Sequence, residues 1–174
     1  MTTLYIVRHG ETTDNVEKIM QGQQHGTLTP AGIAQIEELA VSLSDTHFDA
    51  IVSSDLRRAY DSAQILARHL HLPVLTTTLL RERDWGDFTG LYIPDIKCMP
   101  LPDNVEKMNA LLQRATSFLD WVKASYPDQT VLAVGHGIIN KAIQAVHYRM
   151  LTRDIPKMMN AEYRILCLGK ECRV

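Results

Sequence analysis

Cysteine is scarce in this sequence, and its three copies are not arranged as a disulfide framework or a zinc site. Cys98, Cys167 and Cys172 form no Cys-x-x-Cys pair, so we expect free thiols. The chain also lacks an apolar run of about 18 residues, the length that would suggest a membrane span. Residues 1–3 lead directly into the first predicted strand, and no basic region followed by an apolar one, the pattern of a signal peptide, is seen there. These absences predict a cytoplasmic protein with no membrane partner.

An excess of positive charge is missing as well. The formal net charge of the 174 residues is -2, with 45% hydrophobic and 22% charged residues. These values are ordinary for a globular protein and argue against nucleic acid as the main partner, while a local positive pocket stays compatible with them. A chain of this length can bury roughly 70% of its unfolded surface. We therefore expect one domain over residues 1–174, and the composition indicates no particular oligomeric state.

Two runs of four apolar residues stand out in what the sequence does contain. Leu4–Val7 continues into Arg8-His9-Gly10, and Val131–Val134 continues into Gly135-His136-Gly137. Such runs are typical of strands buried on both faces in a parallel sheet. Shorter strands are expected at 49–52 and 73–75, and an edge strand at 163–168.

Helices are expected between these strands, because apolar residues recur there at spacings of three and four. They are predicted to begin near Thr29-Pro30, Leu56, Asn104 and Gly137. Strands alternating with helices predict an α/β fold, with a mostly parallel sheet and helices on both faces. The segment 13–26 is expected to be a loop. Residues 91–103 contain three prolines, which exclude a long helix, and are predicted to form a short cover over the pocket.

Basic and acidic residues fall where ligands bind in such a sheet, beyond the carboxyl ends of the strands. If they converge, Arg8 and Arg58 offer planar forks of donors for phosphate oxygens. A neutral His9 could attack phosphorus in line, provided its other ring nitrogen is held as a donor. His136 could donate a hydrogen bond to the equatorial oxygens. Glu82 could protonate the leaving alkoxide and then activate a water molecule.

These groups supply positive charge without a metal, so the chemistry predicts no metal site and no cofactor. A second candidate for the proton donor is Asp84, which lies two residues after Glu82; Glu82 is preferred. Glu11 is read as a structural partner of an arginine.

Four blocks of sequence follow one another in a recognisable order. They are Arg8–Thr12 with Asn15, Gln21-Gly22, Leu28-Thr29 and Gly32; Ser54–Ala59; Leu80-x-Glu82-x-x-Trp85-Gly86; and Gly135–Gly137. From about residue 4 to about residue 146 the chain resembles the histidine phosphatase superfamily, in its phosphoglycerate mutase-like branch.

The resemblance implies a three-layer α/β/α sandwich and assigns roles to residues. It implies that His9 is the phosphorylated nucleophile and Glu82 the proton donor. Arg8, Asn15, Arg58 and His136 are then expected to hold the phosphoryl group, and Gln21 and Gly22 to contact substrate. Asn15 suits a turn as well as this role.

The function that the resemblance implies is a metal-independent phosphomonoesterase that hydrolyses a small phosphorylated metabolite through phosphohistidine. A phosphoglycerate mutase is one alternative. It is disfavoured because the cover has Lys97 as its only basic residue, whereas mutases of this family bind a second acidic group there with arginines. A non-catalytic phospholigand-binding regulatory module is the other alternative, and the presence of Glu82 speaks against it.

Overall fold

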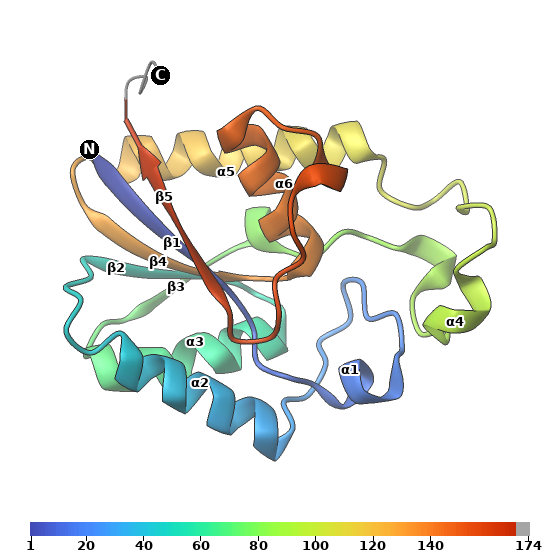
Figure 1. Cartoon of the computed structure of the whole chain (residues 1–174), viewed down its shortest axis with the longest axis horizontal. Helices are drawn as coiled ribbons and strands as arrows, with labels where there is room; N and C mark the ends of the chain where they lie inside the picture. The colour runs from blue at the N-terminus through green and yellow to red at the C-terminus, as the bar shows by residue number, and fades with distance from the viewer. Residues whose placement is uncertain (170–174) are drawn as a thin grey trace.

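A five-stranded sheet with the order β3-β2-β4-β1-β5 runs through the middle of the molecule (Figure 1). The computed structural model describes residues 1–169. The strands β1 (Thr2–Arg8), β2 (Ala50–Ser54), β3 (Val74–Thr77) and β4 (Thr130–Gly135) are parallel. Strand β5 (Tyr163–Leu168) is antiparallel to β1 at one edge. The mostly parallel sheet and the edge strand predicted from the sequence are confirmed.

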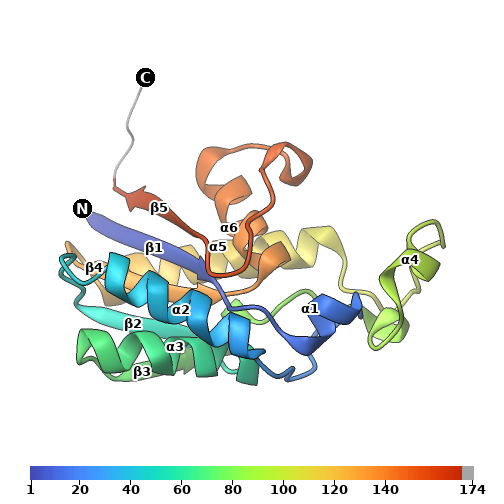
Figure 2. The same cartoon turned by 60° about the horizontal axis from the view of Figure 1, so that its bottom comes forward.

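Two helices cover each face of the sheet (Figures 1 and 2). Helices α2 (Pro30–Ser42) and α3 (Arg57–Leu70) lie on one side, and α5 (Met108–Ser125) and α6 (Gly137–Tyr148) lie on the other. Because successive side chains of a strand point to opposite faces, β1 contributes to both cores. Leu4 and Ile6 pack in the core under α5 and α6, while Val7 packs in the core under α2 and α3. The three-layer α/β/α sandwich is confirmed.

The predicted helix starts are confirmed for α2, for α3, which begins at Arg57, and for α6, which begins at Gly137. The side chain of Thr29 accepts a hydrogen bond from the Gly32 N–H at 2.9 Å, and Pro30 occupies the first helical position. The expected loop at 13–26, however, contains the short helix α1 (Thr13–Glu17). Helix α5 begins at Met108 and not near Asn104, because the residues before it pair with the loop at 83–84.

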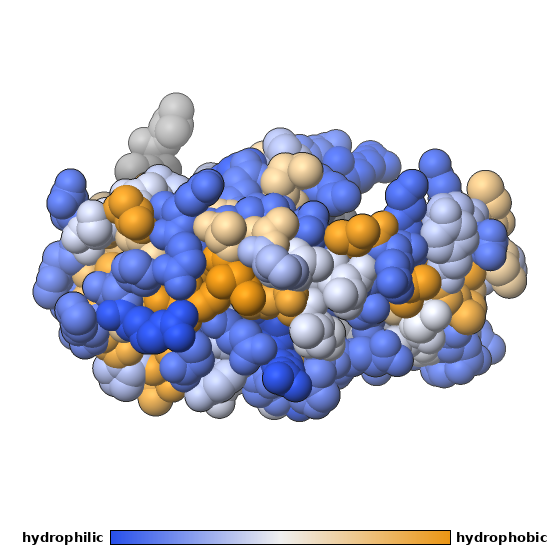
Figure 3. Space-filling model, turned by 90° about the horizontal axis from the view of Figure 1, so that it is seen from below, coloured by the Kyte–Doolittle hydropathy of each residue, from blue (hydrophilic) through white to orange (hydrophobic). Residues whose placement is uncertain are grey.

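The cover at 91–103 contains one short helix, α4 (Ile93–Ile96), as its prolines require. It projects from the same end of the sheet as α1 (Figures 1 and 2). Backbone hydrogen bonds join the two segments, from Met20 N–H to Leu91 O at 2.9 Å and from Ile93 N–H to Lys18 O at 2.8 Å. Hydrophobic side chains are visible at this end in Figure 3, and the exposed ones of the cover are Leu91, Tyr92, Ile93, Met99 and Leu101.

Two observations concern the predicted lack of a membrane span and of disulfide bonds. Within residues 1–169, no helix is both long enough and apolar enough to span a membrane. Cys98 and Cys167 are exposed free thiols, as predicted, and Cys172 lies outside the described residues.

Candidate active site

The carboxyl ends of β1 and β4 place His9 and His136 next to each other. Arg8 at the end of β1 is in register with Gly135 at the end of β4, so the residues that follow the two strands are neighbours. The two imidazole ring centroids are 5.1 Å apart, and both side chains are buried. The structure therefore brings the two strand–histidine–glycine motifs into one site.

His9 is held in the tautomer that a nucleophile requires. Its Nδ1 lies 2.7 Å from the carbonyl oxygen of Gly10, and its Nε2 lies 3.2 Å from Nε of Arg58. A carbonyl can only accept and a guanidinium N–H can only donate, so we assign the proton to Nδ1 and the lone pair to Nε2. Burial, followed by the charge of Arg58, lowers the pKa of His9 well below its usual value. His9 is therefore neutral near pH 7, with Nε2 as a base.

Arg58 is almost fully buried, and most of its donors are used within the protein. Besides the bond to His9, Nη2 donates to the carbonyl of Gly22 at 2.8 Å, and Nη1 donates to the carbonyls of Gln24 and His25. Burial lowers the pKa of Arg58 to about 10, so it stays charged at neutral pH. The expected open fork is thus largely engaged: the loop at 22–25 takes up Nη1 and one N–H of Nη2, and Nε–H donates to His9. One N–H of Nη2 has no partner among these residues.

Besides Oε1 of Gln21, three buried nitrogen atoms at the site have no hydrogen-bond partner among the described residues: Nε of Arg8 and both ring nitrogens of His136. A second nitrogen of the Arg8 guanidinium, Nη1, donates to the carbonyl of Met158 at 2.8 Å. Burial, and then the charges of nearby arginines, lower the pKa of His136 well below its usual value. Buried polar atoms without partners are uncommon in folded proteins, and these three can all serve an anion.

Glu82 lies at the N-terminus of α6, opposite Arg8. Its carboxylate accepts hydrogen bonds from the backbone N–H groups of Ile138 and Ile139, each at 3.1 Å, and from that of Arg83 at 2.9 Å. A Cβ atom built on Gly137 would lie 3.6 Å from Nε of Arg8 and 3.8 Å from Oε2 of Glu82. The two side chains therefore meet at Gly137.

Asp84 lies elsewhere. It is exposed, and its carboxylate accepts from the N–H of Gly86 at 2.9 Å. Of the two candidate acids, only Glu82 is in the site.

The side chain of Asn15 caps helix α1, and its contact with a phosphoryl group stays a prediction. Its side-chain oxygen accepts from the N–H of Thr12 at 3.2 Å, which completes the capping box that begins α1, and from Nδ2 of Asn160 at 3.1 Å. With two donors on the oxygen, the NH₂ group points the other way. Asn15 is thus a helix-capping residue that Asn160 connects to the backbone of His9.

Gln21 and Gly22 lie against Arg58. Gly22 has a positive φ of 52° and presents its carbonyl to Nη2 of Arg58. Gln21 is buried, and a Cβ atom built on Gly26 would lie 2.5 Å from its Oε1 and 3.2 Å from Cδ of Arg58. The structure brings both residues to the site as neighbours of the arginine, and contact with substrate stays a prediction.

Two residues that support the site, Asn160 and Ser62, received no role in the sequence analysis. Asn160 donates to the carbonyl of His9 at 3.1 Å, and the hydroxyl of Ser62 accepts from the N–H of Gly10 and donates to the carbonyl of Arg58. Ser62 lies one helical turn after Arg58, which is a signal that was available, whereas Asn160 has none. The prediction that Glu11 pairs with an arginine was wrong. Its carboxylate accepts a hydrogen bond from the hydroxyl of Thr29 at 2.8 Å.

Residues that could hold a metal are absent from the part of the chain that the structure describes, since no cluster of three His, Cys, Asp or Glu side chains has the required arrangement there. The positive charge at the site comes from arginines. The arrangement can bind an anion, attack it with an imidazole and exchange a proton with it.

Comparisons with known proteins identify the family of this chain. The sequence profile of the histidine phosphatase superfamily (branch 1) matches residues 4–171. The chain is 36% identical over 141 residues to the uncharacterized phosphatase PhoE of Bacillus subtilis, covering 79% of this chain and 72% of that protein. It is 28% identical over 187 residues to a metal-independent phosphoserine phosphatase of Arabidopsis thaliana, covering 97% and 77%. A solved mycobacterial glucosyl-3-phosphoglycerate phosphatase, in complex with VO3, superposes with a TM-score of 0.87 at 31% identity, covering 95% and 92%.

Proposed function

This chain belongs to the histidine phosphatase superfamily, branch 1, and on that basis we propose that it hydrolyses a small phosphorylated metabolite through a phosphohistidine at His9. One observation carries the proposal. Nε2 of His9 is a buried, neutral nucleophile with its lone pair directed at Arg58, because Nδ1 is fixed as a donor. A histidine that only stabilised the fold would not need this tautomer beside a buried arginine, Arg58, and a partly buried one, Arg8.

In the first step, Nε2 of His9 attacks phosphorus as the bond from phosphorus to the leaving oxygen breaks. Nε of Arg58 turns from Nε2 of His9 to a phosphoryl oxygen, and Nε of Arg8 and the ring of His136 donate to the others. The negative phosphoryl group favours the protonated form of His136, which the arginines oppose in its absence. Asn15 directs its NH₂ group to the same oxygens.

Glu82 supplies the proton that the leaving oxygen takes up. Glu82 is the general acid of this step and is left as a carboxylate. In the second step Glu82 removes a proton from water, the hydroxide attacks phosphorus and the bond to Nε2 of His9 breaks. Inorganic phosphate leaves, and both residues return to their starting forms.

Hydrolysis is favoured over a mutase reaction by the chemistry of the cover. Lys97 is its only basic residue and is exposed, while five of its large apolar side chains are exposed. A cover of this composition offers little to retain a second acidic group on a bisphosphorylated intermediate. The names of the relatives, which include a phosphoserine phosphatase and a glucosyl-3-phosphoglycerate phosphatase, support a small phosphomonoester as the substrate class.

The test is phosphate release from p-nitrophenyl phosphate in the presence of EDTA. We expect turnover by the wild type, an acid-labile phosphoenzyme in quenched samples, and loss of both in His9→Asn. His71→Asn, at an exposed histidine, is the matched control. Transfer of phosphate between positions of a phosphoglycerate, dependent on a bisphosphorylated primer, would identify a mutase. Binding of inorganic phosphate without turnover would identify a binding module and refute the proposal.

A further inference from the structure

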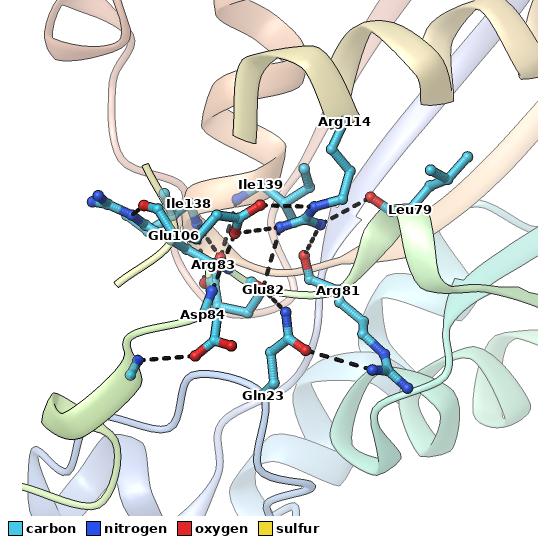
Figure 4. Close-up of polar contacts among 11 residues, drawn as sticks. Gln23, Leu79, Arg81, Glu82, Arg83, Asp84, Glu106, Arg114, Ile138 and Ile139 are labelled. Atoms are coloured by element: carbon cyan, nitrogen blue, oxygen red, sulfur yellow. Dashed lines mark hydrogen bonds and ion pairs between the residues drawn. The ribbon is translucent and has the colours of Figure 1, made fainter. Parts of the chain in front are cut away.

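A half-buried ion pair between Arg114 of α5 and Glu106 lies behind Glu82 (Figure 4). Nε and Nη2 of Arg114 donate to the two carboxylate oxygens of Glu106, at 3.1 and 2.8 Å. The two side chains are 17% and 15% exposed. A bidentate, poorly hydrated pair of this kind has a fixed geometry that a surface pair lacks.

Arg114 also binds the backbone on the N-terminal side of Glu82. Nη1 donates to the carbonyls of Leu79 at 3.1 Å and Arg81 at 2.5 Å, and Nη2 lies 3.4 Å from the carbonyl of Glu82 itself. Figure 4 shows the guanidinium between these carbonyls and Glu106. One side chain thus binds the backbone of the proton donor and of two residues that precede it.

Glu106 binds the backbone on the other side of Glu82. Its N–H donates to the carbonyl of Asp84 at 2.9 Å, and its carboxylate accepts from the N–H of Asp84 at 3.1 Å. Its carbonyl accepts from Nε of Arg83 at 2.9 Å. The loop around Glu82 is therefore held from both ends by a single ion pair.

The loop needs such support because it has little structure of its own. Residues 81–85 form no helix or strand, and Glu82 reaches the N-terminus of α6 only if the loop keeps its path. A general acid must lie within hydrogen-bond reach of the oxygen that it protonates, and an error of about 1 Å in placement can cost about 100-fold in rate.

We infer that Arg114 and Glu106 are positioning residues, which act on the reaction by holding Glu82 at the leaving oxygen. The inference rests on the proposed phosphatase function. The N–H groups of Arg114 are taken up by Glu106 and by the backbone carbonyls of Leu79, Arg81 and Glu82, which leaves none for a phosphoryl oxygen. The bond between Arg81 and Asp55 also reaches this loop, but its arginine side chain is 37% exposed and points to the other side of the loop (Figure 4).

The experiment compares kcat/KM for two substrates that differ in their need for an acid. An alkyl ester such as β-glycerophosphate needs a proton on its leaving oxygen, whereas p-nitrophenyl phosphate has a good leaving group. Glu82→Gln should lose about 10²- to 10⁴-fold on the alkyl ester and much less on the aryl ester. We expect Arg114→Met and the isosteric Glu106→Gln to follow the same pattern, with about 10- to 100-fold losses on the alkyl ester alone. Arg68→Met, which removes an exposed pair with Glu37, should change neither.

The double variant Arg114→Met/Glu82→Gln separates positioning from general support of the fold. If Arg114 acts through Glu82, the double variant is no slower on the alkyl ester than Glu82→Gln alone. Equal losses on both substrates, or fully additive losses, would overturn the inference while leaving the phosphatase proposal intact. If Arg114→Met does not fold, Glu106→Gln decides by the same criteria. A wild type that hydrolyses neither ester, or a Glu82→Gln that does not discriminate between them, would show that the proposed function has failed first.

Discussion

The two buried histidines should make the stability of this protein fall steeply in mildly acidic solution. Burial is the main cause that holds the pKa values of His9 and His136 well below the usual 6.5, and Arg58 adds to it. In the unfolded chain both recover ordinary values. Below about pH 6.5 the unfolded state therefore binds more protons than the folded state, and the free energy of unfolding decreases as the pH falls. At higher pH neither state binds a proton there, and this loss is absent.

The size of the effect follows from the unfolded state alone, provided that both rings stay neutral in the fold. Between about pH 7.5 and about pH 5.5, protonation of one histidine of ordinary pKa in the unfolded chain raises the unfolding equilibrium constant about tenfold. This lowers the free energy of unfolding by ~1 to ~2 kcal/mol. The pair contributes ~3 kcal/mol, a large part of the ~5 to ~15 kcal/mol typical of a domain. His147, whose pKa is lowered mainly by burial, adds in the same direction. The carboxyl of Asp55, whose pKa Arg81 lowers, titrates below this window.

Urea unfolding at the two pH values, followed by tryptophan fluorescence, measures this difference. His136→Asn should remove about half of the pH dependence that the pair causes, since one titrating site is lost. His71→Asn, at an exposed position, is the control and should leave the dependence as in the wild type. Equal pH dependence in the wild type and His136→Asn would refute the reasoning, because the buried ring would then contribute nothing.

Three further substitutions test other contacts of the site. Gly32→Ala should lower the free energy of unfolding by about 1 to 3 kcal/mol in calorimetry, because the new Cβ would lie 2.1 Å from the backbone oxygen of Glu11; a stability equal to wild type would contradict this packing. Asn160→Ala should reduce kcat/KM about tenfold with ~1 kcal/mol of destabilisation, since it removes the donor to the His9 carbonyl; unchanged kinetics would assign it to the fold alone. Arg58→Lys should reduce kcat/KM for p-nitrophenyl phosphate by about 100-fold or more, because an ammonium cannot reproduce the planar fork. The neighbouring exposed Arg57→Lys is its control, and equal effects of the two would refute the role of Arg58.

The framework of the site could be predicted because its signals are local. Leu4–Val7 and Val131–Val134 are apolar without a break, and only a strand covered on both faces needs that pattern. The histidine after each run then belongs to the carboxyl end of the sheet. The position of β4 between β1 and β2, however, depends on how the strands pair in three dimensions, and no local sequence pattern indicates it. The sequence predicted that the two histidines are at one edge, and the pairing of β1 with β4 makes them neighbours.

The supports of the site could not be predicted, because their signals lie in tertiary contacts. Asn160 and Met158 belong to a tail without periodicity, and they reach Arg8 and His9 only because β5 returns beside β1. Arg114 is one polar residue of an amphipathic helix, and nothing in its neighbours marks it. Helix α1 was missed because it is five residues long and buries none of them, so it carries no hydrophobic pattern.

The positive charges near His136 affect both the stability of the protein and the binding of an anion. Burial, and then the charges of nearby groups that include Arg58 and Arg8, keep the ring of His136 neutral in the unliganded protein. That neutrality destabilises the fold in acid, while under the proposed function the charges of Arg8 and Arg58 attract a phosphate dianion, although the whole chain carries a formal charge of -2. On the same proposal, a bound dianion favours the protonated form of His136, so that the ring donates a hydrogen bond as charge spreads over the phosphoryl oxygens. Binding and protonation are then one linked event, and Arg8 and Arg58 act both by direct contact with the phosphoryl group and by setting when His136 becomes charged.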